Sequence, residues 1–280
     1  MTRSPLRSGS RTRQRGPARR GAPALIATPA LLGFAFLVLP LFALVFRAPW
    51  RGLGKLLSDS QVLTALRLSL ECASAATLIS LVLGVPLAWV LARVRLPGMG
   101  LVRALLTLPL VLPPVVGGIA LLVALGRNGM VGRYLDQWFG ITLPFTTAGV
   151  ILAETFVAMP FLIVSVEGAL RSADRDLEEA AVTLGASRIG VFRRVTLPLI
   201  TPSLLAGSIL CWARALGEFG ATITFAGNYP GTTQTMPLAI YGAFESDPPA
   251  ATALSLVLLL VAVTVLAALR DRWLRGVTIL

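Results

Sequence analysis

The sequence predicts an all-α polytopic membrane protein with six transmembrane helices. Hydrophobic residues make up 55% of its 280 positions, and the mean hydropathy is +0.79. A transmembrane helix needs about 20 consecutive apolar residues to cross about 30 Å of hydrocarbon, and several runs in the chain reach that length. Soluble domains seldom contain several long uncharged runs, so this composition excludes an ordinary soluble fold.

The expected spans follow one another along most of the chain. They cover 24–46, 62–91, 104–125, 144–169, 199–225 and 250–269. Between the third and fourth spans, the connector 126–143 carries Arg127, Tyr134 and Trp138, which are residue types typical of a short interfacial helix.

The chain divides into two predicted parts. Residues 1–22 are mainly Arg, Ser, Gly and Pro, a composition that cannot bury a core, and we expect a disordered, Arg-rich cytoplasmic tail there. The transmembrane permease domain is expected over 23–280, with its core at about 60–270. The arginines of the tail either hold it to anionic lipid, at about 1 kcal/mol each, or only set the orientation; the sequence leaves both open.

The distribution of positive charge predicts the orientation of the spans. Counted on alternate sides of the membrane, the tail, 93–103, 171–194 and 270–275 together hold 18 Lys and Arg residues, whereas the opposite side holds 5. Cytoplasmic loops carry the excess of positive charge in membrane proteins. We therefore expect both termini and the segment 171–194 to lie in the cytoplasm.

A polar segment, 171–198, separates the fourth and fifth spans. Acidic residues crowd the start of a helical pattern, where the helix dipole favours negative charge. Gly185 stands where a helix would stop in a left-handed conformation, and Ser187 is suited to cap a second short helix. Pro198 then leads into the next apolar run. The pattern indicates a helix–glycine turn–helix on the membrane surface, with its acidic, alanine-rich part free to face a partner.

Two spans contain charged pairs at i,i+4 spacing, which places both charges of a pair on one helix face. Arg67 and Glu71 form one pair, and Arg214 and Glu218 form the other. Charged groups inside a membrane are costly unless they are paired or face a cavity. Arg214 either lies near an anion path, with Glu218 limiting its charge, or forms a structural ion pair. Glu154 has no local partner, and the sequence does not choose between Arg67 and Arg214 for it.

The third span is interrupted by prolines. Pro113 and Pro114 remove backbone donors in the middle of the expected helix and must break or kink it. Irregular backbone at that depth is tolerated only where it is buried in protein or lines a water-filled cavity. The segment 109–118 is therefore a candidate wall of a translocation path, and a proline kink that serves only packing is the alternative.

The polar segment also carries a family motif. Glu179-Ala180-Ala181, followed by Gly185 and then by Val-Thr-Leu-Pro at 195–198, resembles the EAA loop of permease subunits in bacterial ABC importers. The resemblance implies that this loop is a coupling helix that docks into a cleft of a separate ATPase subunit. The residues to which the resemblance gives the ATPase-coupling role are Glu178, Glu179, Ala180, Ala181, Gly185 and Ala186.

A second likeness covers about 60–270. Arg-Ala-Leu-Gly-Glu-Phe-Gly-Ala-Thr-Ile-Thr-Phe-Ala-Gly-Asn at 214–228 and Leu-Pro-Leu-Val-Leu-Pro-Pro-Val-Val-Gly-Gly at 108–118 are similar to the molybdate ABC permease family. Sulfate and tungstate permeases share a related Gly-Glu-aromatic-Gly segment, so the choice among tetrahedral oxyanions stays open.

The second likeness implies a type I ABC importer permease fold with six transmembrane helices in the bacterial cytoplasmic membrane. It also implies a second copy of the chain, two copies of an ATPase subunit and an extracytoplasmic substrate-binding protein as partners. Candidate residues of the translocation path are Pro113, Pro114, Arg214, Glu218, Thr222 and Thr224.

Several function classes are disfavoured by residues that the sequence lacks. The chain has no His, which removes the usual metal ligand and the usual general base, and we expect neither a cofactor nor an enzyme. Gly54-Lys55 is followed by Leu56, without the upstream Gly of a phosphate-binding loop, so ATP hydrolysis would reside in another chain. An ion-driven secondary carrier that uses Glu71, Glu154 and Glu218 as relays is the remaining alternative.

Overall fold

The computed structural model describes residues 24–94 and 97–277, so the expected tail over 1–22 lies outside the described residues. The described ranges contain helices and no strand. α1 (Ala24–Arg47) matches the first expected span and is described by itself, because the chain divides into one unit that ends at Phe46 and a second that begins at Arg47.

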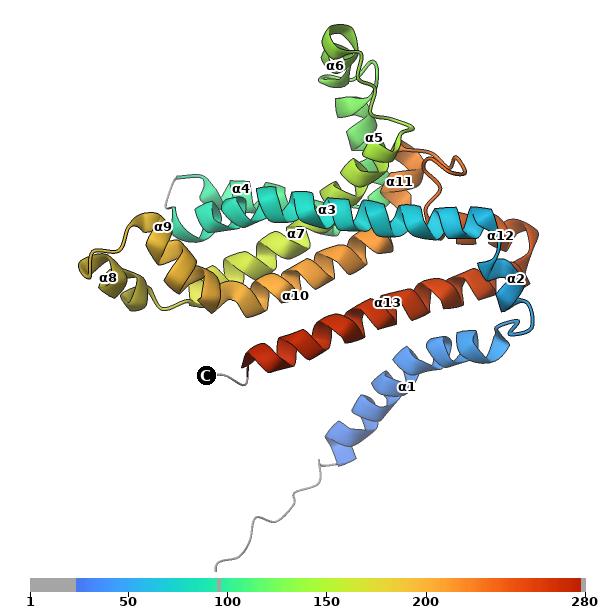
Figure 1. Ribbon diagram of the computed structural model, residues 1–280, viewed down its shortest axis with the longest axis horizontal. Helices are drawn as coiled ribbons and strands as arrows, with labels where there is room; N and C mark the ends of the chain where they lie inside the picture. The colour runs from blue at the N-terminus through green and yellow to red at the C-terminus, as the bar shows by residue number, and fades with distance from the viewer. Residues whose placement is uncertain (1–23, 95–96, 278–280) are drawn as a thin grey trace, which may run out of the picture. The chain divides into compact units, whose positions relative to one another are not determined.

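The second unit is built on four long helices that run side by side (Figure 1). They are α3 (Ser60–Arg93), α7 (Thr147–Ser172), α10 (Leu197–Leu216) and α13 (Pro248–Val277). The core between α3, α7 and α10 is rich in small side chains, such as Ala73, Ala76 and Ala158, with Leu162 and Cys211 among them. Small residues let helix backbones approach closely in a membrane, where dispersion contacts must replace the hydrophobic driving force.

The third expected span is broken at its two prolines. α4 (Met99–Val111) and α5 (Pro114–Leu125) are bent by 118° at this point. α5 and the short α6 (Gly132–Phe139) leave the bundle sideways in Figure 1. α6 lies in the connector 126–143, where a short interfacial helix was expected.

The broken span is held by close packing against α11 (Gly220–Phe225). A Cβ atom on Gly118 would clash with the Thr224 hydroxyl and the Ala221 carbonyl, and one on Gly220 would lie 2.9 Å from Cβ of Pro114. α5 and α11 therefore depend on glycine at their contact, one glycine on each side.

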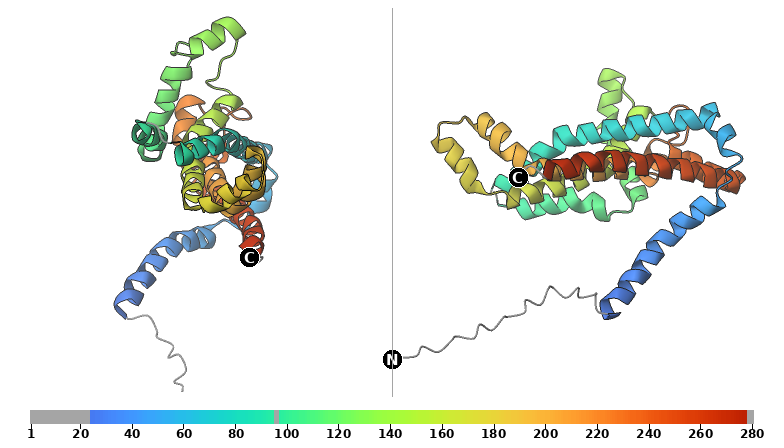
Figure 2. Two further views of the ribbon diagram at one scale, coloured as in Figure 1. Left: turned by 90° about the vertical axis from the view of Figure 1, so that its left-hand side faces the viewer. Right: turned by 60° about the horizontal axis from the view of Figure 1, so that its bottom comes forward.

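The remaining helices lie at the two ends of the bundle. α2 (Leu53–Leu57) and α12 (Met236–Ser246) lie at one end. α8 (Arg175–Thr183), α9 (Arg188–Val191) and the π-helical turn η1 (Phe192–Thr196) lie at the other, which is the end that faces left in Figure 1. The further views in Figure 2 agree with this separation.

The all-α class and the expected membrane spans are confirmed, since the described residues contain five helices that are long and apolar enough to span a membrane, or six if the bent pair counts as one span. The expected boundaries of the fifth span, 199–225, were wrong at both ends. The apolar helical segment covers Arg188–Leu216, and 220–225 forms the separate helix α11. The break has a local cause, because the Glu218 carboxylate accepts the Ala221 N–H at 2.8 Å and so starts a new helix.

We predict that Gly118→Ala destabilises the chain by about 1–3 kcal/mol, because the added methyl group overpacks the contact between α5 and α11. Gly168→Ala is the matched control, since a Cβ atom there would meet nothing within 4 Å. Thermal unfolding in detergent checks the comparison. Equal melting temperatures for Gly118→Ala and the wild type would contradict the packing account.

Candidate functional site

The polar segment folds as its sequence pattern indicates. Asp174 is the N-cap of α8, and its carboxylate accepts the Asp176 N–H at 3.0 Å. Asp176 and Glu178 lie in the first turn, where negative charge interacts favourably with the helix dipole. α8 is therefore a short helix with a well-formed start, and none of its residues is buried.

Gly185 ends α8 in the left-handed region at φ +88°. The Gly185 N–H donates to the Val182 carbonyl at 2.9 Å, and the Ala186 N–H donates to the Ala181 carbonyl at 3.0 Å. This pair of bonds is the Schellman arrangement, which satisfies carbonyls at a helix end. A Cβ atom at position 185 would meet nothing within 4 Å. The constraint on Gly185 is therefore the backbone angle and not the space around it.

The second helix is longer than the sequence pattern indicated. Ser187 caps it as expected, since its hydroxyl accepts the Gly190 N–H at 3.1 Å. The helix then continues from α9 through η1 into α10 without a break. Pro198 lies two residues after the π-helical turn η1, where the regular i→i−4 hydrogen-bond pattern is already interrupted, so its missing N–H is accommodated. The polar segment is thus joined directly to a membrane span.

One carboxylate connects α8 to two other elements. Glu178 Oε1 accepts a hydrogen bond from Arg93 Nη2 at 2.7 Å and another from the Thr196 hydroxyl at 2.8 Å. Arg93 is the last residue of α3, and Thr196 is the last residue of η1. The side chain of Arg93 is only 10% exposed and that of Glu178 is 22% exposed. We call these three residues the Glu178 junction.

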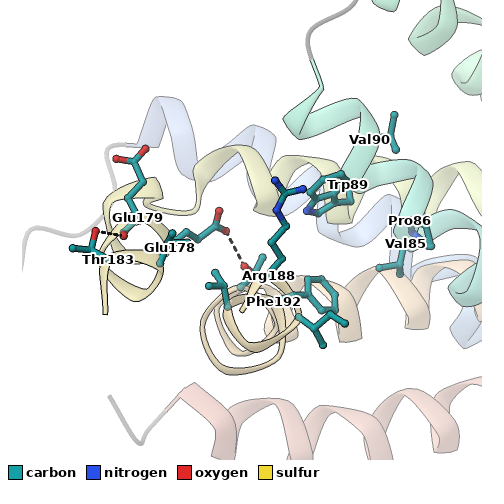
Figure 3. A pocket seen from close by; sticks show the side chains of 13 residues that line it. Val85, Pro86, Trp89, Val90, Glu178, Glu179, Thr183, Arg188 and Phe192 are labelled. Atoms are coloured by element: carbon teal, nitrogen blue, oxygen red, sulfur yellow. Dashed lines mark hydrogen bonds between the residues drawn. The ribbon is translucent and has the colours of Figure 1, made fainter. Parts of the chain in front are cut away.

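Glu179 has a different surrounding from Glu178. It is exposed, and its backbone carbonyl accepts the Thr183 hydroxyl at 2.9 Å. Figure 3 shows its carboxylate pointing away from the hydrogen bond that Glu178 makes. The family resemblance gave Glu178 and Glu179 the same ATPase-coupling role, whereas within the described residues only the carboxylate of Glu178 pairs with other elements of the chain.

A cavity of about 910 Å³ lies beside the Glu178 junction, between α3 and the α8–α9–η1 segment. Val85, Pro86 and Trp89 of α3 line one side, and Ile189 and Phe192 line the other (Figure 3). α8 therefore stands apart from the end of α3 across much of its length, and the Glu178 junction is the polar contact that bridges them.

The structure brings the two predicted parts of the translocation path together. Pro114 packs against Gly220, and Glu218 accepts the backbone N–H that begins α11. Arg214 Nη2 lies 2.6 Å from Glu218 Oε2, so the predicted i,i+4 pair is formed. The Arg214 side chain is 28% exposed, whereas that of Glu218 is 1% exposed. Arg214 is thus the accessible member of the pair.

The two candidate threonines are less suited to contact a passing anion in this conformation. The Thr224 hydroxyl donates to the Gly220 carbonyl at 2.8 Å within its own helix. Thr222 is fully buried, and its hydroxyl has no hydrogen-bond partner among the described residues. Glu154 is also buried, with its Oε2 unpartnered within the same ranges. The structure pairs Arg67 with Glu71 and Arg214 with Glu218, so neither arginine is supplied to Glu154 by these pairs.

Sequence reasoning missed two members of the Glu178 junction. Arg93 was counted only as a positive charge at the end of a span, and Thr196 only as part of the Val-Thr-Leu-Pro motif. Their roles depend on a contact 85 residues apart along the chain, between Arg93 and Glu178. The signal available in the sequence was a polar residue beside each of two expected spans, namely Arg93 after the second span and Thr196 before the fifth.

Comparison with known proteins agrees with this geometry. Residues 84–276 match the family of binding-protein-dependent transport system inner membrane components. The chain belongs to this family. It is a multi-pass membrane protein and a transport component, and the resemblance to ABC importer permeases found in the sequence is confirmed.

Curated relatives cover most of the chain. It is 51% identical over 243 residues to the molybdenum transport system permease protein ModB of Mycobacterium tuberculosis, covering 87% of this chain and 92% of the relative. It is 44% identical over 214 residues to ModB of Escherichia coli, covering 76% and 93%. A sulfate transport system permease protein, CysT of Salmonella typhimurium, is 38% identical over 238 residues, covering 84% and 86%.

Solved structures share the fold at lower sequence identity. A bacterial ABC transporter for import of the acidic polysaccharide alginate matches with a TM-score of 0.73 at 21% identity, covering 90% of this chain and 94% of that one. The MetNI methionine ABC transporter in an inward-facing conformation matches with a TM-score of 0.61 at 17% identity, covering 77% and 95%. The expected ABC importer permease fold is confirmed.

We predict that Glu178→Ala loosens α8, because it removes the polar contact to α3 and η1 and leaves Arg93 largely buried without its carboxylate. Glu179→Ala is the matched control, with the same change one residue along the same helix. Amide hydrogen exchange over 175–187 should speed up in Glu178→Ala alone. The same exchange rates in both variants would show that the Glu178 junction does not hold α8.

Proposed function

We propose that the chain is the transmembrane permease subunit of an ABC importer that carries molybdate across the bacterial cytoplasmic membrane. The observation that carries the choice of substrate is the 51% identity, over most of both chains, to a permease named for molybdenum transport. The lower identity to a sulfate permease, 38%, makes sulfate the runner-up. Tungstate, which shares the tetrahedral geometry, is the other alternative.

The proposed assembly contains two copies of this chain, two ATPase subunits and an extracytoplasmic binding protein. Solved structures with a similar fold support a partnership of this kind, since one of them is an alginate ABC transporter in complex with a periplasmic protein. The chain has no phosphate-binding loop of its own, so ATP would be hydrolysed by the ATPase subunits. The excess of Lys and Arg supports a cytoplasmic position for both termini and for α8.

Coupling is proposed to run from the ATPase to α8 and from α8 into the bundle. The exposed Glu179 and Ala180 and the half-buried Ala181 of α8 would dock on the ATPase, and Gly185 would fix the direction in which the chain leaves α8. Two routes join α8 to the spans. One is the unbroken helix from α9 into α10, and the other is the hydrogen bond from Arg93 at the end of α3.

The translocation path is proposed to run past the bend at Pro113-Pro114 and past Arg214. Arg214 supplies a positive charge that an oxyanion requires, while Glu218 keeps the net charge small so that the anion is not held too tightly. The path needs only weak donors, since the binding protein would do most of the selecting. The proposed cycle is closure of the ATPase pair on ATP, opening of the path to the outside, entry of the dianion, and return after hydrolysis.

The experiment that tests this function is uptake into proteoliposomes that contain the chain, its ATPase subunit and the binding protein. Molybdate uptake should require ATP and the binding protein, and sulfate should compete weakly. Uptake driven by a proton or sodium gradient without the ATPase would establish the secondary carrier instead. Preferential uptake of sulfate would establish the sulfate permease.

We predict that Gly185→Val abolishes the stimulation of ATP hydrolysis by loaded binding protein while the transporter still assembles. A β-branched residue resists the left-handed region, at a cost of about 1–2 kcal/mol, so α8 would end in a different direction. Gly185→Asn is the matched control, because Asn tolerates this conformation. Normal stimulation in Gly185→Val would remove Gly185 from the coupling role.

We predict that Arg214→Gln slows molybdate uptake by about tenfold or more, on the scale of one lost hydrogen bond to a charged group, without preventing assembly with the ATPase. Arg67→Gln is the matched control, since Arg67 also pairs with a Glu at i,i+4 but has a side chain that is 79% exposed. If Arg214→Gln transports at the wild-type rate, the Arg214–Glu218 pair is only structural.

A further inference from the structure

A cluster of three arginines, separate from the Glu178 junction, lies at the same end of the bundle as α8. Arg103 of α4, Arg171 of α7 and Arg175 of α8 line a pocket of about 400 Å³. The end of α3 and the first residue of α4, Met99, complete its wall. We call this cavity the arginine pocket. Among the described residues no acidic side chain lines it, so its charged lining residues are all positive.

One carboxylate next to the arginine pocket fixes the positions of two of its arginine side chains. Glu167, whose side chain is 9% exposed, lies 2.8 Å from Arg103 Nη2 and 3.0 Å from Arg171 Nε. Arg103 also donates to the Leu91 carbonyl at 3.2 Å. Glu167 neutralises one of the three positive charges. Arg175 is exposed and makes no ion pair within the described residues, so a net positive charge remains.

The start of α4 adds to the attraction for an anion. Gly98 is the N-cap of this helix at φ +82°, and within the part of the chain that the structure describes no side-chain hydrogen bond caps the helix start. α4 has 13 residues, long enough for its N-terminus to carry the partial positive charge of the helix dipole. Uncapped helix N-termini of this kind bind phosphate groups readily. The guanidinium groups and the helix end therefore favour the same ligand chemistry.

The surface beside the arginine pocket is apolar. α4 has no buried residue, and Leu101, Leu105 and Leu108 on its outer face are 67%, 59% and 47% exposed. α4 begins at the basic pocket, and its apolar face continues away from it. A phospholipid has the matching arrangement, with a charged headgroup followed by apolar acyl chains. A free oxyanion would gain nothing from such a face. The combination favours a lipid over a dissolved ion.

We propose that the arginine pocket binds the phosphate group of an anionic phospholipid, with the acyl chains along α4. This deepens the proposed function, because it rests on α8 and the adjoining ends of α3, α4 and α7 being cytoplasmic, where a membrane leaflet offers anionic headgroups. The lipid would contact Arg175 at the start of α8 and Arg103 and Arg171 at the ends of the spans. The bound lipid would thus hold α8 and the rest of the polar segment at the membrane surface.

The test is native mass spectrometry of the full chain in detergent, with phosphatidylglycerol or phosphatidylcholine added. The test variant is Arg171→Gln with Arg175→Gln; Arg103 is left intact so that the buried Glu167 keeps one partner. The control is Arg193→Gln with Arg194→Gln, which removes the same charge from exposed positions at the same end of the bundle. Each arginine near an anionic surface contributes about a fivefold preference, so the test variant should bind phosphatidylglycerol about 30-fold more weakly.

The outcomes separate the lipid from other ligands. Preference for phosphatidylglycerol in the wild type and in the control, with its loss in the test variant, supports the proposal. Equal phosphatidylglycerol binding in wild type and test variant overturns it. Displacement of the lipid by millimolar inorganic phosphate or molybdate also overturns it, because the pocket would then take free anions.

The measurement does not depend on the identity of the transported anion. Lipid binding is read on the chain without ATPase or binding protein, so failure of molybdate transport and failure of lipid binding remain distinguishable. Circular dichroism of the test variant should match the wild type. If the test variant does not fold, Arg175→Gln alone, which breaks no ion pair found in the described residues, gives the same comparison with about a fivefold expected loss.

Discussion

The structure depends on one carboxylate that is shared between three elements. Glu178 lies in the first turn of a helix with no buried residue, so α8 buries no apolar side chain that would fix it to the bundle. The hydrogen bonds from Arg93 and Thr196 supply that attachment. A charge-assisted hydrogen bond in a partly buried place is stronger than one in water. It is also directional, which makes it suited to pass a displacement of α8 on to α3.

The other end of the proposed mechanism is built from glycine and proline. The bend of 118° at Pro113-Pro114 directs α5 away from the bundle, and glycine contacts with α11 hold it there. Glu218 connects α11 with Arg214. One of its carboxylate oxygens accepts the Ala221 N–H in the first turn of α11, and the other lies beside the Arg214 guanidinium. A shift of α10, into which α9 runs without a break, would therefore reach Arg214 and the bend through a few short contacts.

Much of this architecture could be predicted from the sequence, because its causes are local. Apolar runs predicted the spans, Pro113-Pro114 predicted a break, and Gly185 and Ser187 predicted the turn and the cap that the structure contains. The limits of the fifth span were wrong because the Glu218 carboxylate accepts the Ala221 N–H in the first turn of the separate helix α11 and because α9 continues into the membrane segment. The Glu178 junction was not predictable, since the Arg93–Glu178 contact forms only when α3 and α8 meet in space. The arginine pocket depends on three helices in the same way.

The central claim is that α8 transmits force to the bundle through the contact between Arg93 and Glu178. A double-mutant cycle of Arg93→Gln, Glu178→Gln and both together, read as molybdate imported per ATP hydrolysed in proteoliposomes, tests it most directly. The account predicts that each single change lowers this ratio and that the double variant is no worse than either single one. Additive losses, or a ratio that stays at the wild-type value in all three, would contradict it.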